Sequence, residues 1–244
     1  MFLPLKDMNP TERKPIVTIS LIVINVLVYL YQMSLGPGAQ AFIASFGATP
    51  FEITRFTDLV GQYGYNIRHF QGPNPIILTL FTSMFMHGSI LHLGGNMLYL
   101  WIFGNNIEDI LGPGKFILFY ILCGLIGHAM HIASSPASLI PTIGASGAIA
   151  GILGAYLIAY PGARVLTLMF LFIFIRLTMI PAWVIIIFWF IIQLFSGFAS
   201  LGGQQGGGTA WFAHIGGFLG GIALILLMAG DYVRWLRKGG FRGW

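Results

Sequence analysis

The sequence predicts an all-α polytopic membrane protein with six transmembrane helices, and three observations support this fold class. Of the 244 residues, 57% are hydrophobic and only 8% are charged, whereas soluble domains carry about 25% charged residues. Apolar runs long enough to cross a bilayer, about 20 residues each, recur along the chain. The net charge of +5 comes from basic residues at the ends of these runs, which favours membrane topology over a nucleic-acid partner.

Five apolar runs predict one helix each. The second run, residues 76–103, is longer than one span needs, so we expect its first part to lie at the membrane interface and its helix to begin near Ile90. The five predicted helices cover residues 16–33, 90–103, 116–132, 145–160 and 213–229.

A sixth apolar segment, residues 165–198, is interrupted only by Arg176 and Pro181. It allows either two helices, or one helix preceded by a connector along the membrane. Both chain ends are rich in Lys and Arg, and the positive-inside rule therefore places both in the cytoplasm, which requires an even number of spans. The segment then contributes one helix, residues 182–198, and of the twelve Lys and Arg residues only Arg55 and Arg68 face outside.

This topology divides the chain into three parts. We expect a cytoplasmic N-terminal segment at residues 1–15, a membrane domain at residues 16–229 and a basic cytoplasmic tail at residues 230–244. The membrane domain includes a large outer loop, residues 34–89, and an outer cap loop, residues 199–212. The sequence carries no recognisable signal or transit peptide, and its compactness favours the plasma membrane of a prokaryote.

This topology places three side chains that could take part in catalysis at the same depth in the membrane. The second, fourth and sixth helices all enter the membrane from the outer face. His92 lies in the first turn of the second helix, Ser146 opens the fourth and His214 opens the sixth. Polar groups within a membrane are costly and usually mark function, so this convergence predicts a site near the outer surface.

Ser146 allows two interpretations. Gly147 and Gly151 form a face of small residues, so the serine could simply belong to a helix-packing surface. At a helix N-terminus, however, its hydroxyl sits among free backbone N–H groups and the positive end of the helix dipole. Those donors could stabilise an oxyanion, which suits a nucleophile.

His214 could likewise be a buried histidine bonded to a carbonyl group. Gly217 and Gly221 follow it on its own helical face, and such a glycine stripe lets another helix approach closely. If the fourth helix is that neighbour, Ser146 and His214 come within hydrogen-bond distance, and the imidazole could act as general base and then general acid. No Asp or Glu is placed to orient the imidazole, so the sequence favours a dyad over a triad.

His92 and Asn96 are four residues apart and share one helical face. Both can donate hydrogen bonds to a developing oxyanion, or they could form a polar clasp between helices. A metal site of His87, His92 and His214 is less favoured, because the sequence has no HExxH motif and no carboxylate nearby. The other three histidines have different expected places: His128 and His131 make packing or interfacial contacts on the third helix, and His69 lies in a loop.

These pieces together resemble the rhomboid intramembrane serine proteases. The resemblance rests on three motifs: His87-Gly-Ser-Ile-Leu-His92-Leu-Gly-Gly-Asn96, Gly144-Ala-Ser146-Gly147 and Ala213-His214-Ile-Gly-Gly217. It covers residues 76–229, and the segment from Trp101 to Glu108 is similar to the one that closes the family's second helix.

The resemblance implies a six-helix rhomboid-like bundle that hydrolyses peptide bonds in or beside transmembrane segments of other proteins. It implies Ser146 as nucleophile, His214 as base, and oxyanion contacts from His92, Asn96 and the Ser146 backbone N–H. The supporting residues would be Gly144, Gly147, Gly217 and His87. The outer loop would be membrane-associated, and the glycine-rich residues 197–208 would form a mobile cap. No cofactor or metal is implied; the partners are transmembrane substrates and the bilayer, and the oligomeric state stays open.

Two departures and two alternatives accompany this interpretation. Some members carry Trp-Arg where this chain has Leu78-Thr79, and some carry an aromatic residue where it has Ala150. The first alternative is a non-catalytic rhomboid-like protein that binds membrane clients, although that class usually lacks the serine or the histidine. The second is a small transporter, for which the sequence offers neither an inverted repeat nor charged residues within the spans.

Overall fold

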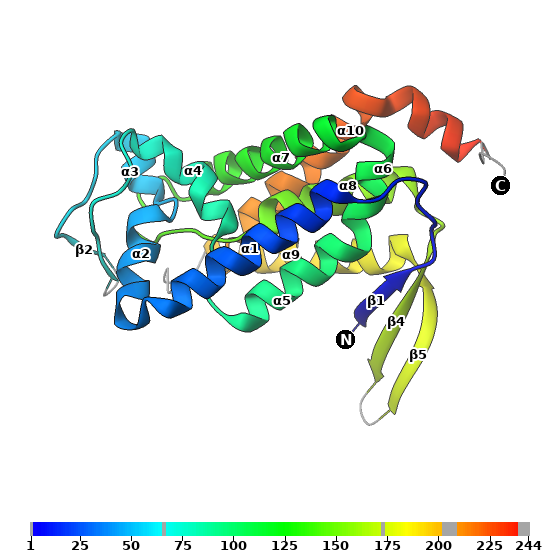
Figure 1. Cartoon of the computed structure of the whole chain (residues 1–244), viewed down its shortest axis with the longest axis horizontal. Helices are drawn as coiled ribbons and strands as arrows, with labels where there is room; N and C mark the ends of the chain where they lie inside the picture. Colours follow the sequence, from blue (N-terminus) through cyan, green and yellow to red (C-terminus); the bar gives the residue numbers. More distant parts are fainter. Residues whose placement is uncertain (1, 65–66, 172–173, 202–208, 239–244) are drawn as a thin grey trace.

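The computed structural model describes residues 2–64, 67–171, 174–201 and 209–238, and its main body is a bundle of helices (Figure 1). Helices form in all six predicted regions: α1 Ile16–Ser34, α5 Ile90–Tyr99, α7 Pro113–Ser134, α8 Ser146–Ala159, α9 Ala182–Leu201 and α10 Trp211–Arg237. A π-helical turn, Leu100–Gly104, joins α5 to α6, Asn105–Leu111.

The length and composition of these helices confirm the predicted fold class, a helical protein that crosses the membrane several times. Among the described residues, α1, α7, α9 and α10 are long and apolar enough to cross a membrane. The segments Ile76–Phe85 and Ile90–Leu111 pass the same criterion only as a pair, bent by 79°. Helix α8 has 14 residues and is therefore only about 21 Å long. The count of six spans stays a prediction.

Several predicted helix boundaries match the structure. Helix α5 begins at Ile90 because the Ser89 side chain caps it, accepting the His92 N–H at 3.1 Å. Helix α9 begins at Ala182, directly after Pro181. The last helix was expected to end at Ala229; instead its backbone leaves helical geometry there and α10 continues to Arg237.

A three-stranded antiparallel sheet lies at one end of the bundle, and the sequence analysis did not predict it. Strands β4 Arg164–Leu171 and β5 Phe174–Pro181 form a hairpin, and β1 Phe2–Asp7 pairs with β4. We expected this hairpin segment to be a connector along the membrane. Its continuous apolar run lacks the alternation that identifies a half-buried strand, and its partner β1 is remote in sequence.

The sheet is fastened to the bundle through Asp7. Its Oδ2 accepts hydrogen bonds from Asn106 Nδ2 at 2.6 Å and from the Tyr156 hydroxyl at 3.0 Å. Burial raises the pKa of the Asp7 carboxyl above its usual value, whereas these two hydrogen bonds oppose the rise. The N-terminal strand thereby contacts both α6 and α8.

The outer loop lies at the opposite end of the bundle from the sheet (Figure 1). It contains helices α2 Ala39–Phe46, α3 Pro50–Arg55 and α4 Thr79–Thr82, the strand pair β2 Tyr63–Gly64 and β3 Ile67–Arg68, and the short turns Gly36–Gly38, Ile76–Leu78 and Ser83–Phe85. It is therefore largely structured, with its own buried side chains.

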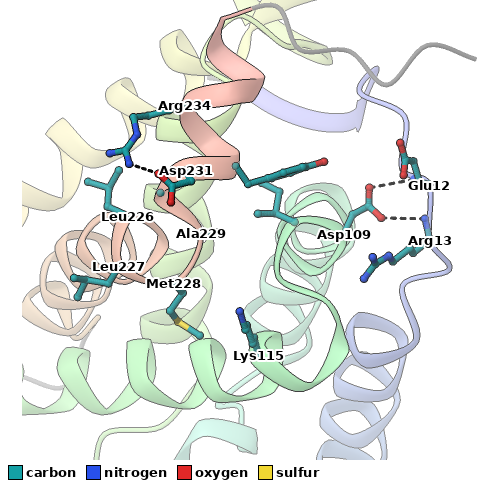
Figure 2. Close-up of a pocket in the computed structure, with 13 residues that line it drawn as sticks. Glu12, Arg13, Asp109, Lys115, Leu226, Leu227, Met228, Ala229, Asp231 and Arg234 are labelled. Carbon is teal, nitrogen blue, oxygen red and sulfur yellow. Dashed lines mark hydrogen bonds and ion pairs between the residues drawn. The ribbon is translucent and has the colours of Figure 1, made fainter.

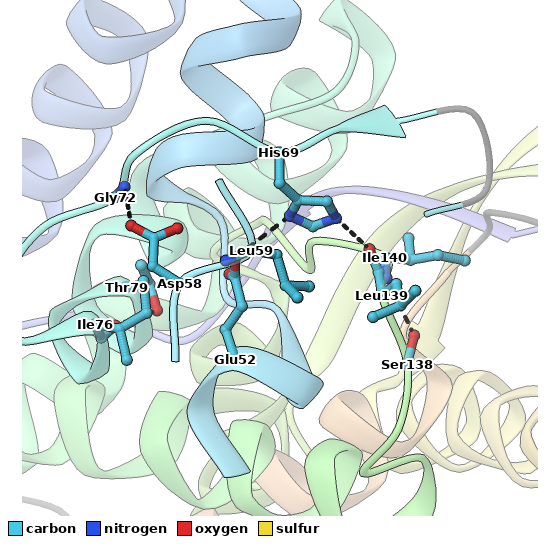
Figure 3. A network of polar contacts seen from close by, with 10 residues as sticks. All are labelled: Glu52, Asp58, Leu59, His69, Gly72, Ile76, Thr79, Ser138, Leu139 and Ile140. Carbon is cyan, nitrogen blue, oxygen red and sulfur yellow. Dashed lines mark hydrogen bonds and ion pairs between the residues drawn. The ribbon is translucent and has the colours of Figure 1, made fainter. Parts of the chain in front are cut away.

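A buried polar network ties the outer loop to the connector between α7 and α8 (Figure 3). His69 was expected to be a loop residue, and it does follow β3, but its side chain is buried. Its Nε2 lies 3.0 Å from the Leu139 carbonyl oxygen, and its Nδ1 lies 3.4 Å from Glu52 Oε1. A β-bridge between Ala48 and Thr142 adds a second tie. The loop therefore holds the stretch of chain that leads into α8.

At the end of the bundle that carries the sheet, two acidic side chains of α6 accept hydrogen bonds from the backbone of the N-terminal segment. Asp109 accepts the backbone N–H groups of Glu12 and Arg13, beside a cavity of about 420 Å³ that Lys115 also lines (Figure 2). The buried Glu108 accepts the backbone N–H groups of Val17 and Thr18, and the Thr18 hydroxyl, at 2.7–2.9 Å. Because α1 has no side-chain cap of its own, Glu108 caps it from a neighbouring helix.

We expect Glu108→Ala to lower the free energy of unfolding by about 3 kcal/mol, because three bonds to a buried carboxylate are lost. The measurement is reversible unfolding in detergent. Asp231→Ala is the control: it removes an ion pair with Arg234 whose two side chains are exposed, and should change the stability by less than about 1 kcal/mol. Equal effects of the two substitutions would contradict this account of Glu108.

Candidate active site

Ser146 and His214 are in direct contact. The Ser146 Oγ lies 2.8 Å from the His214 Nε2, across the interface between α8 and α10. Ser146 is the first residue of α8, and His214 lies in the first turn of α10. The proximity expected from the glycine stripe is therefore confirmed, while the chemical roles of both residues stay predictions.

The contact depends on an unusually close approach of two backbones. A Cβ atom at Gly217 would overlap the carbonyl oxygen of Gly147, and one at Gly221 would overlap that of Gly151. Any side chain at these positions would force α8 and α10 apart. The glycines thereby set the separation at which a serine on one helix meets a histidine on the other.

The chain enters α8 through a conformation that requires glycine. Gly144 has φ +128°, and a Cβ there would lie 2.9 Å from the His92 ring. Its N–H donates to the Ser83 carbonyl at 2.8 Å. No side chain caps α8 in the described structure, so the N–H groups of its first turn, including that of Ser146, have no intrahelical acceptor and remain as donors beside the hydroxyl.

His92 and Asn96 approach the same region from α5, but they are held differently. The His92 ring lies against Gly144. Asn96 directs its Nδ2 to His87 Nε2 at 2.9 Å, so one of its two amide protons is already bound. Gln32 of α1 holds the His87 backbone, accepting its N–H at 3.2 Å and donating to its carbonyl at 2.9 Å. Sequence reasoning missed Gln32, since nothing in the motif points to α1.

A cavity of about 780 Å³ lies over the serine and the histidine. His128 and His131, which we assigned to packing or interfacial contacts, line this cavity; His128 also lies 3.2 Å from the Ser83 Oγ. Ser200 and Thr209, which belong to the predicted cap loop, line it as well, while residues 202–208 of that loop lie outside the described residues. Within the described chain, no group of three His, Cys, Asp or Glu side chains is arranged to hold a metal ion.

Gln193 is a second residue, after Gln32, that sequence reasoning missed. Its Oε1 lies 2.7 Å from the Nδ1 of His214, the ring nitrogen remote from Ser146. An orienting partner was expected to be Asp or Glu, as in a triad, whereas Gln193 is an amide. The available signal was that Gln193 is the one polar side chain in the run 182–195, and polar groups in such runs usually have a specific partner.

Comparison with known proteins places the chain in a family. The rhomboid domain model matches residues 75–231, more than half of the chain. Rhomboid protease GluP of Bacillus subtilis is 36% identical over 143 residues, which cover 59% of this chain and 24% of that protein.

Two mitochondrial proteins are also similar. Rhomboid protein 1, mitochondrial, of Saccharomyces cerevisiae is 33% identical over 97 residues, 38% of this chain and 28% of that protein. Presenilin-associated rhomboid-like protein, mitochondrial, of Mus musculus is 36% identical over 94 residues, 38% of this chain and 25% of that protein. The chain thus spans about a quarter of the length of the curated relatives that it matches. With the rhomboid model covering the three motifs and most of the helical bundle, the chain belongs to the rhomboid family of integral membrane proteins.

Proposed function

We propose that the protein is an intramembrane serine endopeptidase that cleaves peptide bonds in or beside transmembrane segments by a Ser146–His214 dyad. The observation that carries the proposal is the 2.8 Å contact between the Ser146 Oγ and the His214 Nε2 beneath a cavity. A histidine at this distance can accept the hydroxyl proton as the oxygen attacks a substrate carbonyl carbon.

The proposed reaction has two steps. Attack by Ser146 gives a tetrahedral intermediate, and His214 then donates the proton to the leaving amine nitrogen, so that the C–N bond breaks and an acyl-enzyme remains. Water, deprotonated by His214, attacks the ester carbon, and the Ser146 oxygen leaves with the proton that His214 returns. Peptide hydrolysis by this route uses no cofactor.

The proposed oxyanion donors come from two helices. The N–H of Ser146 belongs to the uncapped first turn of α8, and His92 approaches from α5. Asn96 keeps one free amide proton beside its bond to His87, which makes His87 the residue that orients this amide. Donors fixed in advance around a developing negative charge are the largest single contribution in many acyl-transfer enzymes.

The proposed substrates are transmembrane segments of other proteins. A peptide bond in an intact helix has its carbonyl engaged, and lipid cannot satisfy backbone groups that are set free. The segment must therefore unwind where polar groups replace the lost bonds, and the cavity above Ser146 offers the hydroxyl and imidazole groups of Ser138, Thr142 and His131. We further propose, from the distribution of basic residues, that both termini face the cytoplasm of a prokaryotic cell.

The test is cleavage of a single-span model substrate by the full chain reconstituted in liposomes, with the products identified by mass spectrometry. We expect two fragments from one internal cut, formed at the same rate when a metal chelator is present. An intact substrate would favour the alternative, a rhomboid-like protein that binds membrane clients without cleaving them.

We expect His92→Ala and Asn96→Ala each to lower kcat about 100-fold, since loss of one oxyanion donor typically costs about 3 kcal/mol in the transition state. KM should change by less than about threefold. Full kinetics in detergent micelles, with thermal unfolding of each variant as control, measures both constants. A higher KM at unchanged kcat would instead assign these residues to substrate binding.

A further inference from the structure

Helix α9 places one polar side chain against the proposed dyad. Gln193 is polar in an otherwise strongly apolar helix, and its side chain is buried, with only 4% of it exposed. Its amide group makes two contacts: Oε1 lies 2.7 Å from the His214 Nδ1, and Nε2 donates to the Trp189 carbonyl oxygen at 3.1 Å. Both polar atoms of the amide are therefore occupied.

The contact with Trp189 determines which atom donates in each hydrogen bond from Trp189 through Gln193 and His214 to Ser146. A carbonyl oxygen can only accept, so the atom of Gln193 that faces Trp189 must be the NH₂ group. The oxygen then faces the His214 Nδ1, which must carry the ring proton. The remaining nitrogen, Nε2, is unprotonated in the neutral ring, and it is this atom that faces the Ser146 hydroxyl.

The reversed arrangement is disfavoured at both ends. Exchanging the oxygen and nitrogen of Gln193 would bring its oxygen to 3.1 Å from the Trp189 oxygen, so that two acceptors would meet. It would also present an NH₂ group to Nδ1, which would place the ring proton on Nε2. In that tautomer the histidine could not accept the serine proton.

We infer that Gln193 is a positioning residue that holds His214 in the tautomer and orientation needed to accept the Ser146 proton. The inference rests on the proposed function, and it gives the histidine of the dyad an uncharged hydrogen-bond partner. In a triad this task falls to a buried carboxylate. Within a membrane an ionised carboxylate is costly to bury, whereas an amide oxygen supplies the same acceptor without charge.

Two tryptophan rings, Trp189 of α9 and Trp211 of α10, also lie beside the imidazole. The Trp189 ring lies 5.8 Å from the His214 ring, and Trp211 approaches edge-on at 6.3 Å. Ala150, on α8, is too small to cover the ring as an aromatic side chain would. Trp189 and Gln193 are one turn apart, so a single face of α9 orients both the ring plane and the ring proton.

The test compares Gln193→Met with Gln193→Glu in the reconstituted full chain. Methionine keeps the length and burial of the side chain but removes the acceptor. We expect Gln193→Met to lower kcat about 10- to 100-fold, by analogy with the loss that follows removal of the hydrogen-bond partner behind a metal-bound histidine, with KM and the unfolding temperature little changed. A protonated glutamate can donate its O–H to the Trp189 carbonyl, as the amide does, and present its other oxygen to the Nδ1 proton, so Gln193→Glu should recover most of the activity.

The control on the same helix is Phe195→Leu, whose side chain is 74% exposed and which should leave kcat unchanged. If Gln193→Met cleaves within twofold of the unmodified chain, the inference is wrong. It is also wrong if both Gln193 variants lose activity together with a fall in unfolding temperature, because the role would then be structural. Failure of the unmodified chain to cleave any substrate would instead count against the proposed function, which separates the two results.

Discussion

Ser146→Ala and His214→Ala are each expected to abolish cleavage of a reconstituted membrane substrate, lowering kcat by on the order of 10⁴-fold or more. The physical reason is that the serine and the histidine act as one unit: their reacting atoms are 2.8 Å apart, and neither a nucleophile without a base nor a base without a nucleophile performs the first step. The measurement is product formation under single-turnover conditions.

The variant that carries both Ser146→Ala and His214→Ala tests whether the two residues act as one unit. Because the second substitution removes a partner that no longer functions, it should be no less active than either single variant. The unfolding temperatures should stay close to that of the unmodified chain, since the single hydrogen bond between the two side chains contributes only about 1 kcal/mol. Normal turnover by either single variant, or a much larger loss in the double variant, would rule out the dyad.

Gly217→Ala is expected to reduce both stability and cleavage strongly. A Cβ at this position would overlap the backbone oxygen of Gly147, and backbone atoms cannot yield as a flexible side chain can. We expect a loss of about 3 kcal/mol in unfolding free energy and about 100-fold in kcat, because a displacement of about 1 Å between reacting groups has this effect.

Two further glycine variants make the result interpretable. Gly221→Ala meets Gly151 in the same interface one turn away, and should destabilise the protein similarly. A Cβ at Gly94 on α5 would meet no neighbouring atom within 4 Å, so Gly94→Ala should be neutral or slightly stabilising, as expected for alanine in a helix. A stable, active Gly217→Ala protein would show that the helix separation does not set the geometry of the site.

The parts of the site that could be predicted are those encoded in local spacing. Gly217 and Gly221 follow His214 at one helical face, which correctly predicted the close partner helix and thus the contact with Ser146. The start of α5 at Ile90 followed from the end of an overlong apolar run. Residues four apart share a face whatever the rest of the chain does, so such predictions need no tertiary information.

The parts that could not be predicted depend on contacts between remote segments. Gln193 and His214 lie on different helices, and only the packing of α9 against α10 brings them together. Asn96 was correctly placed on the helical face of His92, but its bond to His87 joins α5 to the chain that precedes it, so helical spacing alone does not predict it. The β4–β5 hairpin was missed because an apolar run by itself does not distinguish a strand from a helix.

The most direct test of the central claim is covalent labelling of the intact chain with a fluorophosphonate, followed by mass spectrometry of the labelled peptide. An activated serine attacks the phosphorus, displaces fluoride and keeps the phosphonyl group on its oxygen, whereas ordinary serine hydroxyls do not react. We predict one label per chain, on Ser146, and none in the folded His214→Ala protein. A folded chain that cleaves its substrate yet carries no label on Ser146, or is labelled equally well without His214, would contradict the account.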